Sequence, residues 1–465
     1  MVLKGISIND FLSREPIKNK VSGFSGSAWL NKFEYAFAFF SLFVYSEAVF
    51  MLFITGGANE GDGFDFGSAN YTPIKLCYLI NYLLTLIFLI CRYKRTIYVA
   101  LSNPLFVAIS IYINLSVLWS YTPAETFQGV IALSFTTLFG FYMACRFTLK
   151  EQITILSYVL LTTVILSFVF AIALPKYGVM AGVHGGAWRG VFLHKNQTGK
   201  LMALACSVML IMLNQVRKYS VKRTWMYLIG LFLAFLLIIQ TTSGGGLLNS
   251  VFIMAIVLIT RVFRAEPRKL FLSLIIISVA AVFVSVGYSK IMSFTLGLVG
   301  KDPTLTGRTD IWEYIYTKIG QEPAFGYGFQ GFWHGFAGES RYIIQRVGWE
   351  VPDAHHGFLD MTLQIGIIGS SMVCLSLWQT LLRGIARVRL FKSWVGSWPA
   401  VYMLFTVLVN LSETSLLASN SILWVLLVMT IFTTSFEAKC LLDIDRFSLT
   451  EKSEFLRSKI INERS

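Results

Sequence analysis

Two short segments hold the residues whose types and spacing are best suited to chemistry. The first, 182–196, closes with cationic and amide side chains: Arg189, His194, Lys195 and Asn196. The second, 352–360, contains the adjacent pair His355 and His356. Arginine binds a phosphate at two points and lysine adds a compact charge, whereas a neutral imidazole can act as a general base. The two segments therefore indicate anion binding combined with proton transfer.

Each segment also has a purely structural interpretation. The cations of 182–196 are compatible with side chains that reach from a membrane edge to water, although the glycines among them favour a backbone that approaches a ligand closely. In 352–360 we expect Asp353 to cap a following helix, which places both histidines in its first turn. A helix N-terminus disfavours a positive imidazolium, and His356 shares a helix face with Asp360. Either histidine is a candidate base, and both are candidates for a structural role.

A third cation, Arg308, precedes a segment in which apolar residues recur with helical spacing. Over 309–320 these residues share one face, which predicts a helix with Thr309 as its N-cap. An arginine beside a helix N-terminus favours an anion. An exposed arginine without a ligand is the alternative interpretation.

Two further patterns carry less information. Residues 326–331 read Gly-Tyr-Gly-Phe-Gln-Gly, which fits the dinucleotide-binding spacing, but they follow Pro323 in a connection and not a buried strand. We expect these glycines to permit turns. The five histidines lack the spacing of zinc ligands, so we expect neither a metal ion nor a cofactor.

The elements that position these residues are membrane spans. Of the 465 residues, 55% are hydrophobic and only 14% are charged, and the mean hydropathy is +0.65. Such a composition excludes a disordered chain, a coiled coil and an ordinary soluble enzyme. Runs of roughly 20 apolar residues predict an all-α polytopic membrane protein with about twelve spans: 33–54, 74–91, 99–119, 127–145, 152–174, 197–215, 224–241, 244–262, 270–289, 356–382, 398–414 and 418–437.

The basic residues predict the orientation of these spans. Most of the 39 lysines and arginines fall in the N-terminal segment, in alternate connections and in the tail, which marks that face as cytoplasmic. The net charge of +14 is thus explained by the orientation of the spans and by contact with anionic lipid. We expect no nucleic acid partner and no cleavable signal peptide. The predicted parts are a cytoplasmic segment 1–32, spans within 33–289, a long extracytoplasmic loop 290–355, spans within 356–437 and a cytoplasmic tail 438–465.

This topology brings the chemistry-bearing residues to the outer face. All five histidines fall in the two larger outer connections, and a short outer turn at 410–413 adds the acidic side chain of Glu413. The spans carry almost no charge, with Glu47 as the main exception, whereas a transporter usually places ionisable groups at mid-membrane. We therefore favour an enzyme over a transporter of a lipid-linked sugar, and over a structural subunit of a synthesis complex.

Three blocks of residues, taken in their order along the chain, resemble the O-antigen ligase and Wzy-type polymerase superfamily of bacterial envelope glycosyltransferases. The blocks are Trp188–Asn196, Gly307–Trp312 with Gly326–Gly328, and Ala354–Gly369. The pattern Trp-Arg-Gly-x-x-x-His-Lys-Asn in the first block is more similar to exopolysaccharide polymerases than to lipopolysaccharide ligases. Two positions depart from the family pattern: His356 stands where an asparagine is usual, and Gln364 where a glutamate is common.

The resemblance implies a bacterial inner-membrane enzyme that polymerises polyprenyl-diphosphate-linked oligosaccharide repeat units, with its site facing the periplasm or the exterior. It implies that Arg189 and Arg308 hold the diphosphate and that His355 activates the acceptor hydroxyl, without a metal or a cofactor. Other substrate contacts are expected from the remaining polar groups: Lys195, His194, Asn196, His356 and Glu413. The alternatives are an O-antigen ligase that transfers polymer to lipid A core, and a lipid-linked sugar transporter. Expected partners are membrane lipid and the proteins of polysaccharide export and chain-length control.

Overall fold

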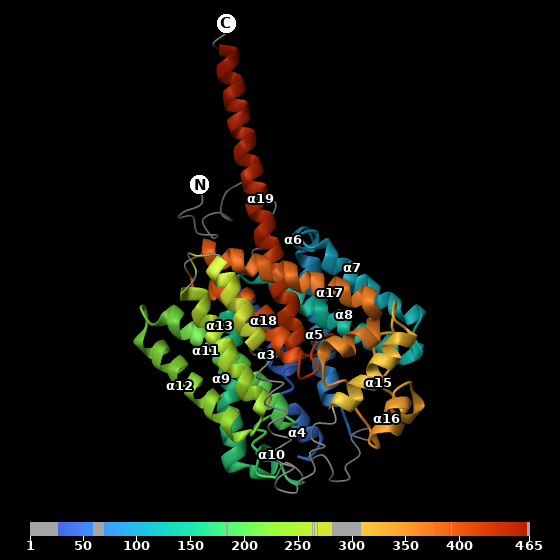
Figure 1. Cartoon of the computed structure of the whole chain (residues 1–465). Coiled ribbons are helices and arrows are strands. Elements are labelled where there is room, and N and C mark those ends of the chain that lie inside the picture. The colour runs from blue at the N-terminus through green and yellow to red at the C-terminus, as the bar shows by residue number, and fades with distance from the viewer. Residues whose placement is uncertain are drawn as a thin grey trace.

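The computed structural model is a helical bundle from which one helix projects (Figure 1). It describes residues 27–58, 69–182, 185–262, 264, 266, 268–280, 308–391 and 393–462, without the side chains of 308–310 and 444–462. Within these residues the regular structure is helical, and one isolated β-bridge joins Val179 to Trp188.

The helices are joined by short connections in most of the bundle. In chain order they are α3 (Ala28–Tyr45), α4 (Phe50–Ile54), α5 (Thr72–Cys91), α6 (Tyr93–Ala100), α7 (Pro104–Leu115), η2 (Ser116–Leu118), α8 (Pro123–Arg146), α9 (Leu149–Ala173), α10 (Pro175–Gly178), α11 (Lys195–Val216), α12 (Val221–Gln240), α13 (Gly244–Val262), α15 (Arg308–Gln321), η5 (Gly335–Ala337), α16 (Arg341–Val347), α17 (Gly357–Leu390), η6 (Val395–Ser397), α18 (Trp398–Asn410) and α19 (Ile422–Asn462).

Eight helices of the described residues are long and apolar enough to cross a membrane, which confirms an all-helical polytopic architecture. They are α5, α8, α9, α11, α12, α13, α17 and the Ile422–Asp443 part of α19, and each overlaps a predicted span. Large apolar side chains cover their outward faces, such as Leu79 and Leu83 on α5 and Phe232 on α12. This distribution is expected where a helix faces lipid.

Two predicted spans are broken. The 33–54 stretch consists of α3 and α4, because the chain turns between Tyr45 and Phe50. The 99–119 stretch is interrupted at Asn103, which caps a new helix that begins at Pro104. The helices on the two sides of that proline meet at 93°, since proline is well placed at the start of a helix but not inside one.

Of the two other predicted spans, one is a shorter helix and one is described only in part. The 398–414 stretch corresponds to the apolar helix Val395–Asn410. The 270–289 stretch is helical over 268–280, and its remainder lies outside the described residues. Counted with the bent pair as one span, the described residues contain up to nine candidate spans, against about twelve expected from run length.

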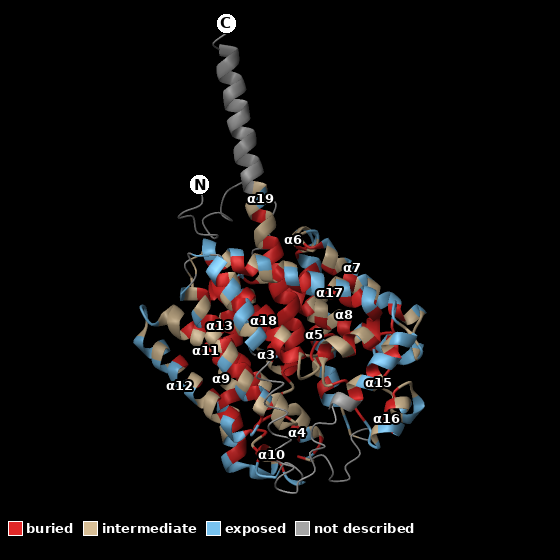
Figure 2. Cartoon of the chain, in the orientation of Figure 1, coloured by how far each residue is buried: buried red, intermediate tan, exposed pale blue. Residues whose placement is uncertain are grey.

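Three helices, α11, α18 and α19, form the centre of the bundle, where buried residues are concentrated (Figure 2). Trp398 of α18 and Trp424 of α19 are among the largest fully buried side chains. At its beginning, α11 touches α13 so closely that a Cβ on Gly246 would lie 2.8 Å from the Gly199 Cα. This contact fixes the first turn of α11 against the first turn of α13.

Residues 308–357 form a layer at one side of the bundle that includes α15 and α16 (Figure 1). α15 confirms the helix predicted at 309–320, but it begins at Arg308, so Thr309 lies inside its first turn and is not the predicted N-cap. The layer has its own apolar cluster, which includes Ile311, Ile315 and Phe332. It meets α17 at Gly366, where φ is +66° and a Cβ would lie 2.1 Å from the Ala324 carbonyl oxygen. Gly326 and Gly328 also have positive φ, so the glycines of 326–331 permit turns, as predicted.

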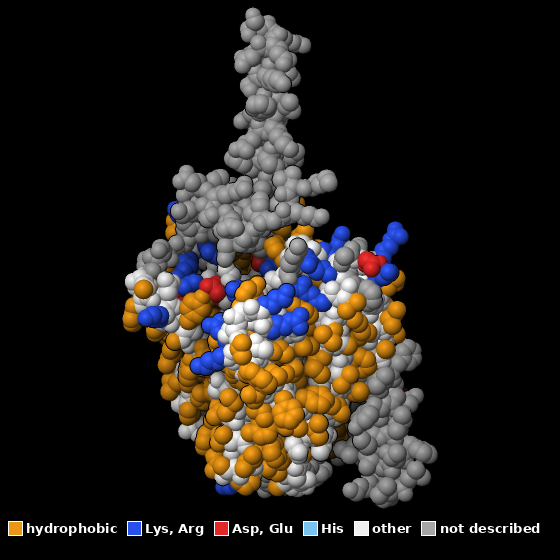
Figure 3. All heavy atoms as spheres, turned by 90° about the vertical axis from the view of Figure 1, so that its left-hand side faces the viewer, with side chains coloured by type: hydrophobic (Ala, Val, Ile, Leu, Met, Phe, Trp, Pro, Cys, Tyr) orange, Lys and Arg blue, Asp and Glu red, His pale blue; other side chains and the backbone are white. Residues whose placement is uncertain are grey.

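Lysine and arginine side chains gather near the end of the molecule from which α19 projects, beside a hydrophobic flank (Figure 3). Several helices end there in mutual contact. Arg387 of α17 pairs with Glu437 of α19, and Arg264 donates to the Val388 carbonyl at 2.8 Å. We call this region, which includes Arg264, Arg387 and the basic connection 217–223, the basic end. That this end faces the cytoplasm stays a prediction from the basic residues.

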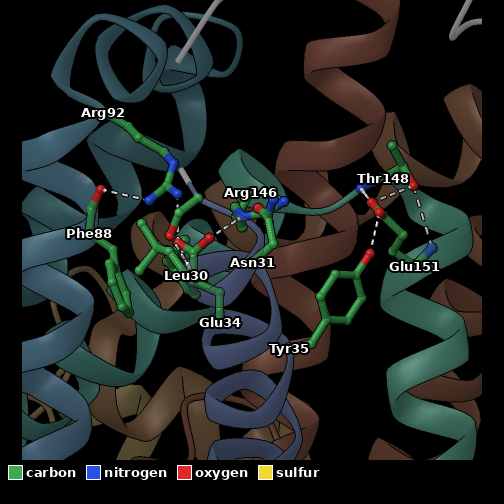
Figure 4. Close-up of polar contacts among 11 residues, drawn as sticks. Leu30, Asn31, Glu34, Tyr35, Phe88, Arg92, Arg146, Thr148 and Glu151 are labelled. Carbon is green, nitrogen blue, oxygen red and sulfur yellow. Dashed lines mark hydrogen bonds and ion pairs between the residues drawn. The ribbon is translucent and has the colours of Figure 1, made fainter. Parts of the chain in front are cut away.

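A buried ion network ties the first described helix to the basic end (Figure 4). Glu34 of α3 is fully buried and pairs with Arg92 at 2.6 Å and with Arg146 at 2.5 Å. Tyr142 donates to the same carboxylate at 3.3 Å, and Asn31 accepts from Arg146 at 2.7 Å. Because a buried charge without a partner is costly, these contacts fix α3 against the ends of α5 and α8.

Candidate active site

The paired histidines lie immediately before α17. This helix begins at Gly357 and its N-cap is His356, whose Nδ1 accepts a hydrogen bond from the Leu359 amide at 3.3 Å. The expectation that Asp353 caps the helix, with both histidines in its first turn, is wrong. The imidazole of His356 takes the capping position, so both histidines precede the helix and have different environments.

His355 is held by a carboxylate. Its backbone has a φ of +46°, and its Nδ1 lies 3.4 Å from Asp353 Oδ1. The same oxygen accepts from the His355 amide at 2.6 Å and from the Thr414 hydroxyl at 3.0 Å. A carboxylate at Nδ1 orients the ring and leaves Nε2 as the basic nitrogen. The side chain of His355 is 26% exposed, so Nε2 is accessible to a substrate.

His356 has a different environment. Its ring packs edge-on against Trp312 at a centroid distance of 5.3 Å and also contacts Phe358. Burial lowers the pKa of His356 because the charged imidazolium loses its solvation. A neutral ring is also what the cap requires, since Nδ1 must keep its lone pair to accept from the Leu359 amide. The geometry therefore gives His356 a structural task.

The buried carboxylate of Asp360 makes hydrogen bonds next to the histidine segment. Asp360 Oδ1 accepts from Trp333 Nε1 at 2.6 Å and from the Ala354 amide at 3.3 Å, and Oδ2 accepts from Gln364 Nε2 at 2.6 Å. Gln364 in turn accepts from the Gln330 amide at 3.0 Å. Asp360 therefore connects α17 to the layer of 308–357, and it does not pair with His356 on the shared helix face.

α15 brings the position of Arg308 to the histidine segment. Trp312 Nε1 donates to the Ala354 carbonyl at 2.9 Å, and its ring contacts His356. Arg308 is the first residue of α15, one helical turn before Trp312. The side chain of Arg308 lies outside the described residues, and its backbone position is one turn before the residue that contacts Ala354 and His356.

The turn after α18 also meets the histidine segment. The Gly357 amide donates to the Glu413 carbonyl at 3.1 Å, and Thr414 donates to Asp353. Inside the turn, Asn410 Oδ1 accepts from the amides of Ser415 and Leu416 at 2.9 and 3.0 Å. The structure thus places Glu413, half-buried, beside His355.

The second predicted segment forms the beginning of α11. His194 is the N-cap of this helix, and its Nδ1 accepts from the Asn196 amide at 3.1 Å. Lys195 Nζ donates to Thr242 Oγ1 at 3.4 Å, and Asn196 Oδ1 accepts from Ser243 Oγ at 3.4 Å. Histidine therefore caps both α11 and α17, a role that the sequence did not indicate.

The beginning of α13 connects the two segments. Ser243 and Thr242, which contact the α11 segment, directly precede Gly244, the first residue of α13. A Cβ on Gly245 would lie 3.8 Å from Ser412 Oγ, and Ser412 belongs to the turn that holds Asp353. The start of α13 therefore links Lys195 and Asn196 of α11 to the turn whose Thr414 contacts Asp353.

Arg189 lies deeper than the other predicted site residues. Its side chain is 0% exposed. The guanidinium donates to four backbone carbonyls, those of Tyr177, Ala58, Gly57 and Lys176, at 2.6–3.2 Å. Its own carbonyl accepts from the Thr198 hydroxyl of α11. In this arrangement Arg189 fastens the 182–196 connection to the turns after α4 and at α10.

The sequence did not indicate that two further residues hold the histidine segment in place. Thr414 and Trp312 hold the histidine segment through single hydrogen bonds, and neither residue type marks a site. His334, one of the five histidines, contacts Thr122 and the Gln330 carbonyl within its loop, and His184 lies outside the described residues. Among the residues that the structure describes, no group of three His, Cys, Asp or Glu could hold a metal ion.

Comparisons with known proteins show what the chain is similar to. Residues 229–374 match the family model described as O-antigen ligase. A stretch of 117 residues is 32% identical to the exopolysaccharide production protein ExoQ of Rhizobium meliloti (strain 1021). This stretch covers 24% of this chain and 26% of that protein. The two matches show that parts of the chain are similar to O-antigen ligases and to an exopolysaccharide production protein. The O-antigen ligase match includes Arg308, His355 and His356, whereas the Arg189–Asn196 segment and Glu413 lie outside it.

Proposed function

We propose that the chain is a membrane glycosyltransferase that joins polyprenyl-diphosphate-linked oligosaccharide repeat units into an envelope or extracellular polysaccharide. The observation that carries this proposal is the oriented pair Asp353–His355, accessible and adjacent to a helix start that carries Arg308. A base and cations at one point of a lipid-embedded bundle suit a substrate with a hydroxyl, a diphosphate and a lipid tail.

In the proposed reaction, an acceptor hydroxyl attacks the anomeric carbon of the donor. His355 Nε2 takes the hydroxyl proton as the new carbon–oxygen bond forms. The bond between the anomeric carbon and the diphosphate oxygen breaks, and its electron pair leaves with the diphosphate. Arg308 and Lys195 stabilise the charge that develops there. A general base typically contributes about a hundred- to ten-thousand-fold to the rate.

The surrounding groups have supporting tasks in this proposal. Asp353 holds the Nδ1 side of His355 and stabilises the imidazolium after proton transfer. Arg189, enclosed by carbonyl oxygens, positions the segment that carries Lys195 and Asn196. Glu413 and His194 border the space for the sugar. The site faces away from the basic end, and therefore towards the periplasm or exterior of a bacterial inner membrane, where export and chain-length proteins would receive the product.

The proposal is tested by replacing the base. We expect His355→Ala to lower polymer formation by about a hundred-fold or more in membranes supplied with the lipid-linked repeat unit. His356→Asn, which keeps a capping side chain, is the matched control and should retain most of the activity. Equal activities of His355→Ala and the wild type, at equal protein level, would refute the role of His355.

A second function, ligation of finished polymer to lipid A core, is favoured by the description of the matching family model. Both functions use the same displacement at an anomeric carbon and differ in the acceptor. A deletion strain separates them. Single repeat units without long polymer indicate a polymerase, whereas long polymer that remains on its lipid carrier indicates a ligase.

A further inference from the structure

The turn between α3 and α4 places a carboxylate beside the 182–196 segment. Glu47 and Val49 have φ values of +59° and +70°, and the Val49 amide donates to the Val191 carbonyl at 2.7 Å. A left-handed backbone is rare at a β-branched residue and persists only where the surroundings impose it. The turn therefore holds Glu47 at a fixed point next to the chain that leads into α11.

The contacts of Glu47 come from the first turns of α11. Gln197 Nε2 donates to Glu47 Oε2 at 3.2 Å, and Lys200 lies close enough to attract the carboxylate. Gln197 directly follows Asn196, so Glu47 lies beside the first turn of the helix that carries Lys195 and Asn196. A carboxylate repels a diphosphate, which means that its task differs from that of Lys195. Hydroxyl groups are the neutral donors that a carboxylate accepts from most readily.

Tyr78 of α5 adds a second polar group at this place. Its side chain is 7% exposed, and its hydroxyl lies near enough to Glu47 to interact with that charge. Within the part of the chain that the structure describes, this hydroxyl is buried and makes no hydrogen bond. A buried polar atom without a partner is unfavourable, so the hydroxyl is suited to a partner that is not part of this chain.

The two tyrosines that stack on Tyr78 differ from it, because both of their hydroxyl groups make hydrogen bonds. Tyr45, Tyr78 and Tyr82 form a stack with centroid distances of 5.5 and 6.4 Å. Tyr45 donates to Asn81 at 2.7 Å, and Tyr82 donates to Asn420 at 2.5 Å. The outer two tyrosines are thus satisfied inside the protein, whereas the hydroxyl of the middle one makes no hydrogen bond among the described residues.

We propose that Glu47 and Tyr78 bind hydroxyl groups of the sugar ring nearest the diphosphate, and so help to select the repeat unit. The inference rests on the proposed function, because the sugar lies one bond from the diphosphate that Lys195 faces. Glu47 accepts from a sugar hydroxyl, and Tyr78 exchanges one further hydrogen bond with the ring. Gln197 and Lys200 hold the carboxylate in place.

Tyr78→Phe separates binding from folding. Removal of an unsatisfied buried hydroxyl should leave the unfolding temperature of the purified protein equal or higher. The KM for the lipid-linked repeat unit should rise about tenfold with little change in kcat, as for loss of a contact made equally in the bound and transition states. Tyr82→Phe is the matched control: it removes a satisfied hydroxyl, lowers stability and leaves KM unchanged.

Glu47→Gln tests the carboxylate in the same assay, with repeat units extracted from a strain that lacks this protein. We expect KM to rise about tenfold or more, since a charged acceptor is lost. Glu313→Gln, on the exposed surface of α15, serves as control for loss of a carboxylate and should match the wild type. Unchanged KM in both Tyr78→Phe and Glu47→Gln would overturn the sugar-binding inference.

His355→Ala, measured in the same assay, separates failure of the sugar-binding inference from failure of the proposed function. If it is inactive while Tyr78→Phe and Glu47→Gln keep the wild-type KM, only the sugar-binding inference falls. If it is as active as the wild type, the proposed function falls and the inference with it.

Discussion

At the scale of single residues, the candidate site contains two adjacent histidines with separate tasks. His355 has a carboxylate at Nδ1 and an accessible ring, as a general base requires. His356 uses Nδ1 to cap α17 and is packed against Trp312. The sequence left either histidine as the candidate base, because adjacency alone does not say which ring meets a carboxylate. The backbone supplies that distinction, with His355 in the left-handed region.

The cap made by His356 should depend on pH. Burial lowers the pKa of His356 in the folded state, whereas the unfolded chain keeps the ordinary value of about 6.5. The stability that this group contributes is therefore present above about pH 6.5 and is lost as the pH falls through the lowered pKa. We expect the unfolding temperature of the wild type to fall more steeply below about pH 6.5 than that of His356→Asn. Identical slopes in thermal unfolding of the two proteins would contradict the capping role.

Asp360 should act on catalysis through the position of His355. Asp360→Ala leaves Trp333 Nε1 and Gln364 without their acceptor, and each lost buried partner costs about 1–3 kcal/mol. The Ala354 amide, next to His355, is released as well. We expect a lower unfolding temperature and a reduced kcat, both partly restored in Asp360→Asn, which keeps one acceptor oxygen. A variant with full kcat despite lower stability would show that the network does not position the base.

Arg189 shows what sequence could not reveal at this scale. Its type and its place beside His194 favoured an anion ligand, and it lies outside the O-antigen ligase match. The structure gives its guanidinium to carbonyl oxygens of residues 57, 58, 176 and 177. Carbonyls are present at every residue, so no sequence pattern indicates which of them will converge on a buried arginine.

At the scale of elements, the position of α3 depends on one carboxylate. Glu34→Ala leaves Arg92 and Arg146 buried without their common partner, and breaking a buried pair in this way costs about 3–5 kcal/mol. We expect a marked drop in the unfolding temperature in detergent. Glu266→Ala is the control, because its pair with Lys269 is exposed and such pairs contribute about 0–1 kcal/mol. Similar unfolding temperatures for the two variants would contradict this account of α3.

The elements themselves were predictable where one apolar run makes one helix. α8, α9 and α13 begin and end within a few residues of the predicted spans. The break at Pro104 has a visible signal, since proline starts a helix more readily than it continues one. The break between α3 and α4 has none, because Glu47 and Val49 adopt positive φ without a glycine. That break depends on tertiary contacts such as the bond from Val49 to Val191.

At the scale of the whole molecule, the candidate site and the basic end lie at opposite ends of the same helices. α11 begins at the site with Lys195 and ends next to the basic connection 217–223. α17 begins after His356, is broken at Gly366, where the backbone is not helical, and carries Arg387 and Arg389 in its last turn. A helix of α11's length spans about 30 Å at 1.5 Å per residue, the thickness of a bilayer core. The two ends therefore belong on opposite faces of a membrane.

This arrangement predicts which residues can be labelled from outside the cell. In a variant whose six cysteines are replaced by serine or alanine, a single cysteine is introduced at Glu313 or at Tyr219. Glu313 is exposed on α15 near the site, and Tyr219 is 83% exposed at the basic end. A membrane-impermeant maleimide that reaches the periplasm should label Glu313→Cys in intact cells, because basic connections stay on the cytoplasmic side. Tyr219→Cys should be labelled only after the inner membrane is made permeable.

A labelling control in detergent and the opposite labelling pattern test whether the candidate site faces outward. Both variants must label fully in detergent, so that a missing signal reports the membrane and not a hidden thiol. Labelling of Tyr219→Cys in intact cells, with Glu313→Cys protected, would place His355 and Lys195 on the cytoplasmic face. A site there could not pass its product directly to the exterior, and the assignment to an outward-facing polymerase would have to be abandoned even if His355→Ala were inactive.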